Sequence, residues 1–213
     1  MVTDAEANAV GAVANTTAQA IEVARGLGGY VKDVLGQIPS DLLGIAVGDW
    51  VSQQRQRNLA RMQAKTRRIL EDIDPSRITE PSASVVLPLL RAAADEGREE
   101  LQALWAALLA NSMIDEGKRV RRTFFDAVAK MEPVDARVLD ILGRHPACPG
   151  GNGAAIEVSL LDAGIARLEA TISLDSLSKL GICNGQLPFD SKSIANIIIS
   201  PFGAGLFQAC GVA

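Results

Sequence analysis

The chain has 213 residues, of which 48% are hydrophobic and 22% charged, a composition typical of a folded globular protein that excludes a disordered one. The net charge of −4 argues against nucleic-acid binding by the surface as a whole, but not by a local basic patch. Aromatic residues make up only 4% of the chain, so we expect a core built mainly from aliphatic side chains.

The cysteine and histidine content predicts neither a metal site nor a cofactor. Cys148, Cys183 and Cys210 lie far apart without a CxxC pair, and His145 is the single histidine. We therefore expect reduced thiols and a cytoplasmic protein. The N-terminus does not resemble a signal peptide, and the longest unbroken apolar run, 103–110, is much shorter than the about 20 residues that span a membrane.

Residues 1–34 are rich in Ala and Gly, and we expect them to be a weakly structured segment. Residues 35–131 are expected to form a helical domain, which opens with a long helix over 41–73 that Pro75 ends. No acidic residue occurs between Asp49 and Glu71. The helix carries four basic residues at steps of four, four and three, so they share one face: Arg57, Arg61, Lys65 and Arg68.

This cationic amphipathic helix has three interpretations. A run of charges is most often only a solvated helix face. A basic amphipathic helix also binds anionic lipid, and Trp50, with the apolar stretch 42–48 before it, suits the interface between water and lipid. A clamp for nucleic-acid phosphates is the third interpretation, and it is weakened because no aromatic residue alternates with the basic ones.

Three further helices are expected in this domain, over 85–95, 99–113 and 124–131. The helix over 99–113 shows the clearest periodicity, with Leu101, Leu104, Trp105 and Leu108 on one face. We interpret the stripe around Trp105 as the main core and not as a groove for a partner.

Residues 132–213 predict a winged-helix-like module with a small β-hairpin. Helices are expected over 133–143, 158–168 and 173–180, strands over 182–189 and 194–200, and a last helix over 201–210. The loop 145–153 would lie inside the module. The helix over 173–180 would occupy the place of the DNA-recognition helix of a winged helix. Its only basic residue is Lys179, beside the acidic Asp175. A DNA-reading helix needs more basic and amide groups, so we expect a packing or protein-contact module.

Candidate catalytic groups find no support in the sequence. His145 and Cys148 are close only within a loop rich in Pro and Gly, and the PGGNG stretch lacks the lysine of a phosphate-binding loop. The acidic cluster Glu71, Asp72 and Asp74 is typical of a solvated helix end. We therefore expect no enzyme activity and no small-molecule substrate.

Several segments together resemble the Abi-alpha family of bacterial proteins. They are DLLGIAVGDWVSQQRQRNLARMQAKTRRIL (41–70), EELQALWAALLANSM (99–113), FFDAVAKMEPVDARVLDIL (124–142), SLDSLSKLGI (173–182) and SPFGAGLFQACG (200–211). The resemblance covers roughly 35–213, and none of its segments is a catalytic signature. It implies a role in abortive infection, a form of phage defence, without implying a biochemical activity.

Two hypotheses follow from the sequence. The first is a non-enzymatic anti-phage protein that acts at the inner membrane surface, or oligomerises there, through Trp50, Arg57, Arg61, Lys65 and Arg68. In it, the C-terminal module would hold a protein partner. The alternative is a cytosolic winged-helix adaptor or regulator that binds a protein or, with less support, nucleic acid.

Overall fold

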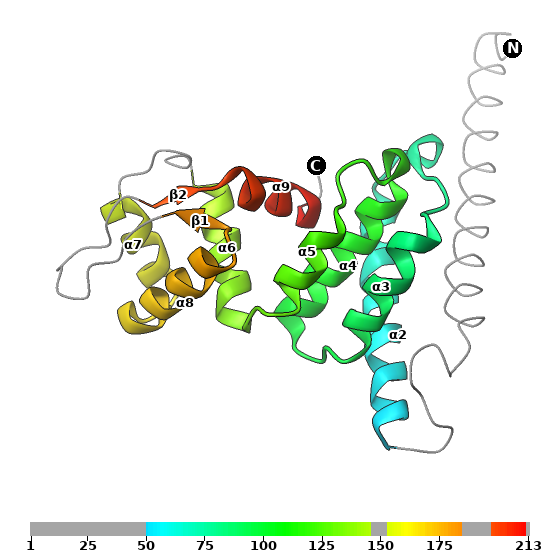
Figure 1. Ribbon diagram of the computed structural model, residues 1–213, viewed down its shortest axis with the longest axis horizontal. Helices are drawn as coiled ribbons and strands as arrows, with labels where there is room; N and C mark the ends of the chain where they lie inside the picture. Colours follow the sequence, from blue (N-terminus) through cyan, green and yellow to red (C-terminus); the bar gives the residue numbers. More distant parts are fainter. Residues whose placement is uncertain (1–49, 146–152, 185–196, 212–213) are drawn as a thin grey trace, which may run out of the picture.

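The computed structural model describes residues 50–145, 153–184 and 197–211, and it confirms a mainly helical fold with one small antiparallel hairpin (Figure 1). The expected segment 1–34 and the first part of the expected helix over 41–73 lie outside these residues. The first group of elements comprises α2 (Trp50–Glu71), α3 (Ala83–Ala94), α4 (Glu99–Met113) and α5 (Arg122–Val128), with short 3₁₀ turns at Pro75–Arg77 and Asp115–Gly117.

The second group of elements begins a few residues after α5 and lies beside the first group (Figure 1). It comprises α6 (Pro133–Arg144), α7 (Gly153–Asp162), α8 (Arg167–Lys179), β1 (Cys183–Asn184), β2 (Ile198–Ile199) and α9 (Pro201–Cys210). In the hairpin, Cys183 pairs with Ile199 and Asn184 with Ile198. The last helix, α9, leaves the hairpin and packs on α4 and α6, so it joins the two groups (Figure 1).

Helix α4 is the centre of the molecule, because it packs against α2, α3, α5, α6 and α9. The predicted face around Trp105 is buried except for the half-buried Leu104, and burial extends beyond one face: every residue from Trp105 to Met113 is buried. Small alanine side chains on the other faces allow this, because they let neighbouring helices approach closely on all sides.

The C-terminal module differs from its prediction at Gly164, where one expected helix is interrupted. The expected helix over 158–168 is two elements, because Gly164 adopts a φ of 75° and ends α7. The backbone N–H of Gly164 donates to Leu161 O at 2.9 Å, and that of Ile165 donates to Leu160 O at 3.0 Å. These bonds satisfy the last carbonyls of α7 in the way glycine-terminated helices do. Consequently α8 begins at Arg167, well before the expected start at 173.

Ser173, the expected first residue of the helix over 173–180, lies inside α8 and is buried. Its hydroxyl donates to Asp135 Oδ1 at 2.5 Å, which ties α8 to the first turn of α6. Asp135 Oδ2 also accepts from the backbone N–H of Glu132 at 2.8 Å and so completes a capping box at the start of α6. Because both oxygens of this buried carboxylate are bonded, α6 and α8 form a fixed pair.

A second fixed point connects α9 to the central helix. The buried amide of Asn111 on α4 donates to Ala209 O at 3.0 Å and to Gly211 O at 3.1 Å. Ala209 lies in the last turn of α9 and Gly211 directly follows the helix, so neither carbonyl has an intrahelical donor. The side chain of Asn111 therefore holds the end of α9 against the first group of helices.

A charged cluster joins the α3–α4 connection to the start of α6. The Arg98 guanidinium donates to both carboxylate oxygens of Glu96 at 2.9 Å and also pairs with Glu132 at 2.5 Å. Glu96 is only 9% exposed. Burial raises its pKa, but the hydrogen bonds and charge of Arg98 outweigh burial and hold the pKa of Glu96 below its ordinary 4.5.

We expect Glu96→Gln to lower the free energy of unfolding by about 1 kcal/mol at pH 7, a modest value because Arg98 is 43% exposed to screening solvent. The carboxyl is more acidic in the folded than in the unfolded chain, so its contribution is complete above about pH 4.5 and disappears as the pH falls through the folded-state value. Thermal unfolding of both proteins from pH 8 to pH 3 checks this. A difference that stays constant with pH would contradict it.

Candidate functional site

Helix α2 presents one buried and one exposed face. Leu59, Met62 and Leu70 are buried, and the helix packs against α3 and α4. The opposite face begins with Trp50, whose side chain is 73% exposed. Arg57, Arg61 and Arg68 are also exposed.

These four residues align along the helix. Arg57, Arg61 and Arg68 follow Trp50 by 7, 11 and 18 residues, which are close to two, three and five turns of 3.6 residues. The structure therefore places one aromatic and three guanidinium groups on a single solvent-facing strip. We call Trp50, Arg57, Arg61 and Arg68 the α2 basic face.

Lys65, the fifth predicted residue, lies at the flank of this strip. It is half-buried, and its ammonium group pairs with the Glu99 carboxylate at the start of α4. The hydrogen bond and the charge of Lys65, with a further contribution from Arg61, lower the pKa of Glu99. Lys65 thus has a structural partner. Arg67, which the sequence pattern did not single out, is exposed on the other flank.

Two buried hydrogen bonds and one exposed ion pair hold α2 in place beneath this face. Asn58 Nδ2 donates to Ala94 O at 2.9 Å, and the Thr66 hydroxyl donates to Ala106 O at 3.2 Å. The Arg55 guanidinium forms a two-point contact with the Asp95 carboxylate at 2.5 and 3.1 Å. The α2 basic face is therefore presented by a rigid scaffold, so a ligand would not have to order it.

A second set of exposed apolar side chains lies on α7 and α8 of the C-terminal module and was not predicted. Leu168 and Ile172 on α8 are 69% and 59% exposed, and Val158 and Leu161 on α7 are 56% and 49% exposed. The sequence contains a signal for it: Leu168 and Ile172 are four residues apart and out of phase with the buried Ala170, Leu174 and Leu177. We call Val158, Leu161, Leu168 and Ile172 the α7–α8 apolar patch.

Helix α8 contains nearly all of the segment 173–180, which the sequence places at the position of a recognition helix. Lys179, the only basic residue of this helix besides Arg167, pairs with Asp175 at 2.6 Å. The Arg167 guanidinium donates to Glu157 at 2.6 Å through its Nε. Helix α8 thus exposes the aliphatic side chains of Leu168 and Ile172, while its basic side chains are already paired with carboxylates. Such a surface suits contact with a protein much better than contact with a phosphate backbone.

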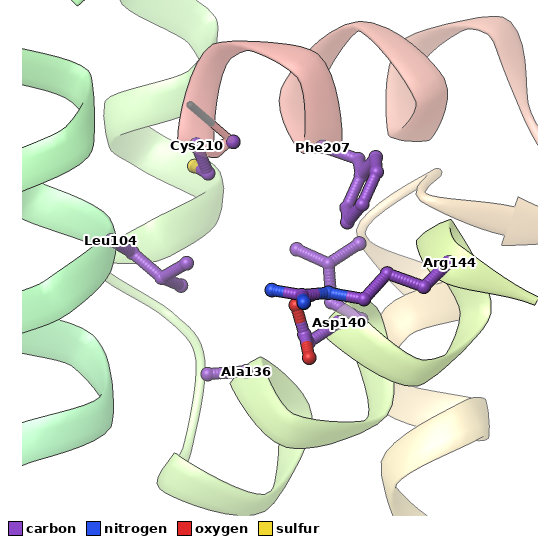
Figure 2. A pocket seen from close by; sticks show the side chains of 8 residues that line it. Leu104, Ala136, Asp140, Arg144, Phe207 and Cys210 are labelled. Carbon is purple, nitrogen blue, oxygen red and sulfur yellow. The ribbon is translucent and has the colours of Figure 1, made fainter. Parts of the chain in front are cut away.

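A cavity of about 460 Å³ lies where α4, α6 and α9 meet. Leu104 enters it from α4, Ala136 from α6 and Phe207 from α9, and the facing side chains of Asp140 and Arg144 form an ion pair of 2.7 Å at one side (Figure 2). The Cys210 thiol also lines it, and burial raises the pKa of this thiol to about 12, so it stays protonated.

Other candidate groups do not assemble into a reactive site within the described residues. Cys183 is buried and its thiol donates to Leu174 O at 3.7 Å. Cys148 lies outside the described residues, so its proximity to His145 stays untested. In the part of the chain that the structure describes, no three His, Cys, Asp or Glu side chains are grouped to hold a metal ion. Among those same residues, no helix combines the length and apolar character needed to cross a membrane.

Comparison with known protein families shows to which family the chain belongs. The family model described as Abortive infection alpha matches residues 54–210, from the first turns of α2 to the last residue of α9. The chain belongs to the Abortive infection alpha family. Its function at that level is abortive infection, a form of phage defence. The match confirms the resemblance seen in the sequence, and it includes Arg57, Arg61 and Arg68 but begins after Trp50. No curated protein and no solved structure matches the chain.

Proposed function

We propose that this family member is a non-enzymatic effector of abortive infection that binds the anionic inner surface of the cell membrane through the α2 basic face. One observation carries the proposal: an indole that is 73% exposed lies on the same strip as three exposed guanidinium groups. Tryptophan favours the region of lipid headgroups, and arginine is attracted to anionic headgroups. The protein would then be cytoplasmic and peripheral to the membrane.

The energy of this contact comes mainly from charge. Each basic residue near an anionic surface contributes about 1 kcal/mol, so three arginines contribute about 3 kcal/mol before the indole is counted. Salt screens such attraction within about 10 Å at 0.1 M ionic strength, so binding must weaken as salt is added. A rigid helix lying flat on the surface presents all three guanidinium groups at once, since they share one strip.

The test is flotation of the full chain with vesicles of phosphatidylcholine alone and with added phosphatidylglycerol. We expect binding only to the anionic vesicles and a loss of at least about 100-fold in affinity for Arg57→Glu/Arg61→Glu/Arg68→Glu, since removing about 3 kcal/mol of attraction already corresponds to two powers of ten and the new carboxylates are repelled by the anionic surface. The matched control reverses three exposed basic residues elsewhere, Arg121, Arg122 and Lys130, and so changes the net charge equally.

Equal weakening by the two triple variants would show that binding follows net charge and not the α2 basic face. Absence of flotation with either type of vesicle would overturn the proposal. Circular dichroism of each variant establishes that the helices remain folded, which separates loss of binding from loss of structure.

The alternative function is a cytosolic winged-helix adaptor or regulator, and the exposed Leu168 and Ile172 favour its protein-binding form. Its nucleic-acid form has little support on α8, where Lys179 is paired with Asp175. If the wild-type chain does not float and is instead retained by DNA or RNA in a manner that added salt abolishes, the nucleic-acid form becomes the better explanation.

A further inference from the structure

The described residues with large exposed apolar side chains fall into two main groups, one at each end of the molecule. Trp50 and Val51 begin α2, and the α7–α8 apolar patch lies on the winged-helix module. Helix α2 lies at one end of the long axis, whereas α7 and α8 lie at the other (Figure 1). Because a rigid core separates them, the two surfaces cannot meet within one molecule.

The two surfaces carry opposite charge. The α2 basic face has three exposed guanidinium groups, and α2 contains no acidic residue before Glu71. The α7–α8 apolar patch has the exposed carboxylates Asp162 and Glu169 beside it, and residues 131–213 as a whole contain five basic and eight acidic residues. Each surface therefore offers exposed apolar side chains together with a charge opposite to that of the other surface.

From this complementarity we propose that the α7–α8 apolar patch binds the α2 basic face of a second copy of this chain. Trp50 packs among the aliphatic side chains of the patch, and the arginines of α2 approach Asp162 and Glu169. The contact is heterologous, because it joins two different surfaces, so a pair of bound copies still has one free α2 basic face and one free α7–α8 apolar patch. Self-association then proceeds head to tail and not only to a dimer.

A symmetric contact between two α7–α8 patches is less favourable. It would bring Asp162 and Glu169 of one copy near the same carboxylates of the other, and like charges at an interface are destabilising. It would also leave Trp50 exposed. The head-to-tail contact covers both apolar groups and neutralises both charges. Because opposite charges contribute to the contact, we expect self-association to be markedly sensitive to salt.

Mixing two variants tests the proposal directly. The patch variant, Leu168→Glu/Ile172→Glu, keeps only the α2 basic face, and the face variant, Arg57→Glu/Arg61→Glu/Arg68→Glu, keeps only the patch. In sedimentation velocity at rising concentration, we expect the wild-type chain to form species larger than a dimer. Each variant alone should stay monomeric. An equimolar mixture of the two should form a one-to-one dimer that does not grow further.

Several results would overturn the proposal: a wild-type chain that stays monomeric at the highest usable concentration, a mixture without a dimer, or a face variant that still self-associates as the wild type does. The last result would indicate a symmetric contact between patches. Thr123→Glu/Ala129→Glu, two exposed positions at the ends of α5, is the matched control and should associate as the wild type does.

This inference does not depend on membrane binding, and the two can fail separately. The patch variant retains the α2 basic face, so it should float with anionic vesicles as a monomer if the proposed function holds. If the patch variant floats while no mixture forms dimers, only the self-association is wrong. If dimers form while nothing floats, only the membrane proposal is wrong. If both hold, the two contacts compete for one surface, and anionic vesicles should dissociate the assembly.

Discussion

Replacing Gly203 with alanine is expected to destabilise the fold by about 3 kcal/mol or more, beyond the usual 1–3 kcal/mol for overpacking a core. A Cβ atom on Gly203 would lie 1.9 Å from the carbonyl oxygen of Ile182, where no side chain fits. This oxygen cannot turn aside cheaply, because it accepts a hydrogen bond of 2.9 Å from the backbone N–H of Ser200. Urea unfolding followed by circular dichroism measures the loss.

The same helix provides the control for this prediction. Gly205 also lies in α9, but a Cβ there would be 3.4 Å from the Phe124 ring, an ordinary contact. Alanine is favoured over glycine inside a helix by about 1 kcal/mol, so Gly205→Ala should be neutral or stabilising. Equal destabilisation by both changes would indicate that α9 tolerates no methyl group at all and would contradict the specific contact with Ile182.

Trp105→Ala is expected to cost about 3–5 kcal/mol, as large-to-small changes of aromatic core residues do. The indole is 1% exposed at the centre of α4, and its ring centroid lies 6.1 Å from that of Phe125. Because α4 contacts five other helices, a cavity here weakens both groups of elements at once. Thermal unfolding should show one cooperative transition at a lower temperature, with near-ultraviolet dichroism reporting the altered packing.

The phenylalanine variant at this position separates packing from hydrogen bonding. Among the residues that the structure describes, no acceptor bonds to the Trp105 indole N–H. A buried donor without a partner costs about 1–3 kcal/mol, and Trp105→Phe removes it while leaving most of the ring. We therefore expect Trp105→Phe to cost much less than Trp105→Ala. Equal losses would mean that the N–H group makes an essential bond.

These stability variants also serve the functional experiments. A protein destabilised by Gly203→Ala can lose defence activity only because it unfolds, whereas the arginine changes on α2 lie on a solvated strip and leave the core intact. A loss of protection by the α2 variants with an unchanged unfolding transition would therefore identify the α2 basic face as functional.

Most elements and several of their ends were predictable from the sequence, because local chemistry determines them. Ser200 followed by Pro201 starts α9, where the serine hydroxyl accepts from the backbone N–H of Gly203 at 2.9 Å. Gly181 ends α8 with a φ of 73°, as a glycine at that position does. The alignment of Trp50 with the α2 arginines also follows from helical periodicity, and the family was recognisable from the order of its motifs.

Only the tertiary structure decided which side chains of these elements remain exposed. Lys65 shares the spacing of the arginines on α2, but the start of α4 places Glu99 beside it and neutralises it. Leu168 and Ile172 are of the aliphatic types that usually fill a core. They are exposed because the side of α8 that faces the interior of the module carries Ala170, Leu174 and Leu177. Periodicity determines which residues of one helix share a face. Whether that face meets another element depends on contacts between residues far apart in the chain, and local sequence does not encode them.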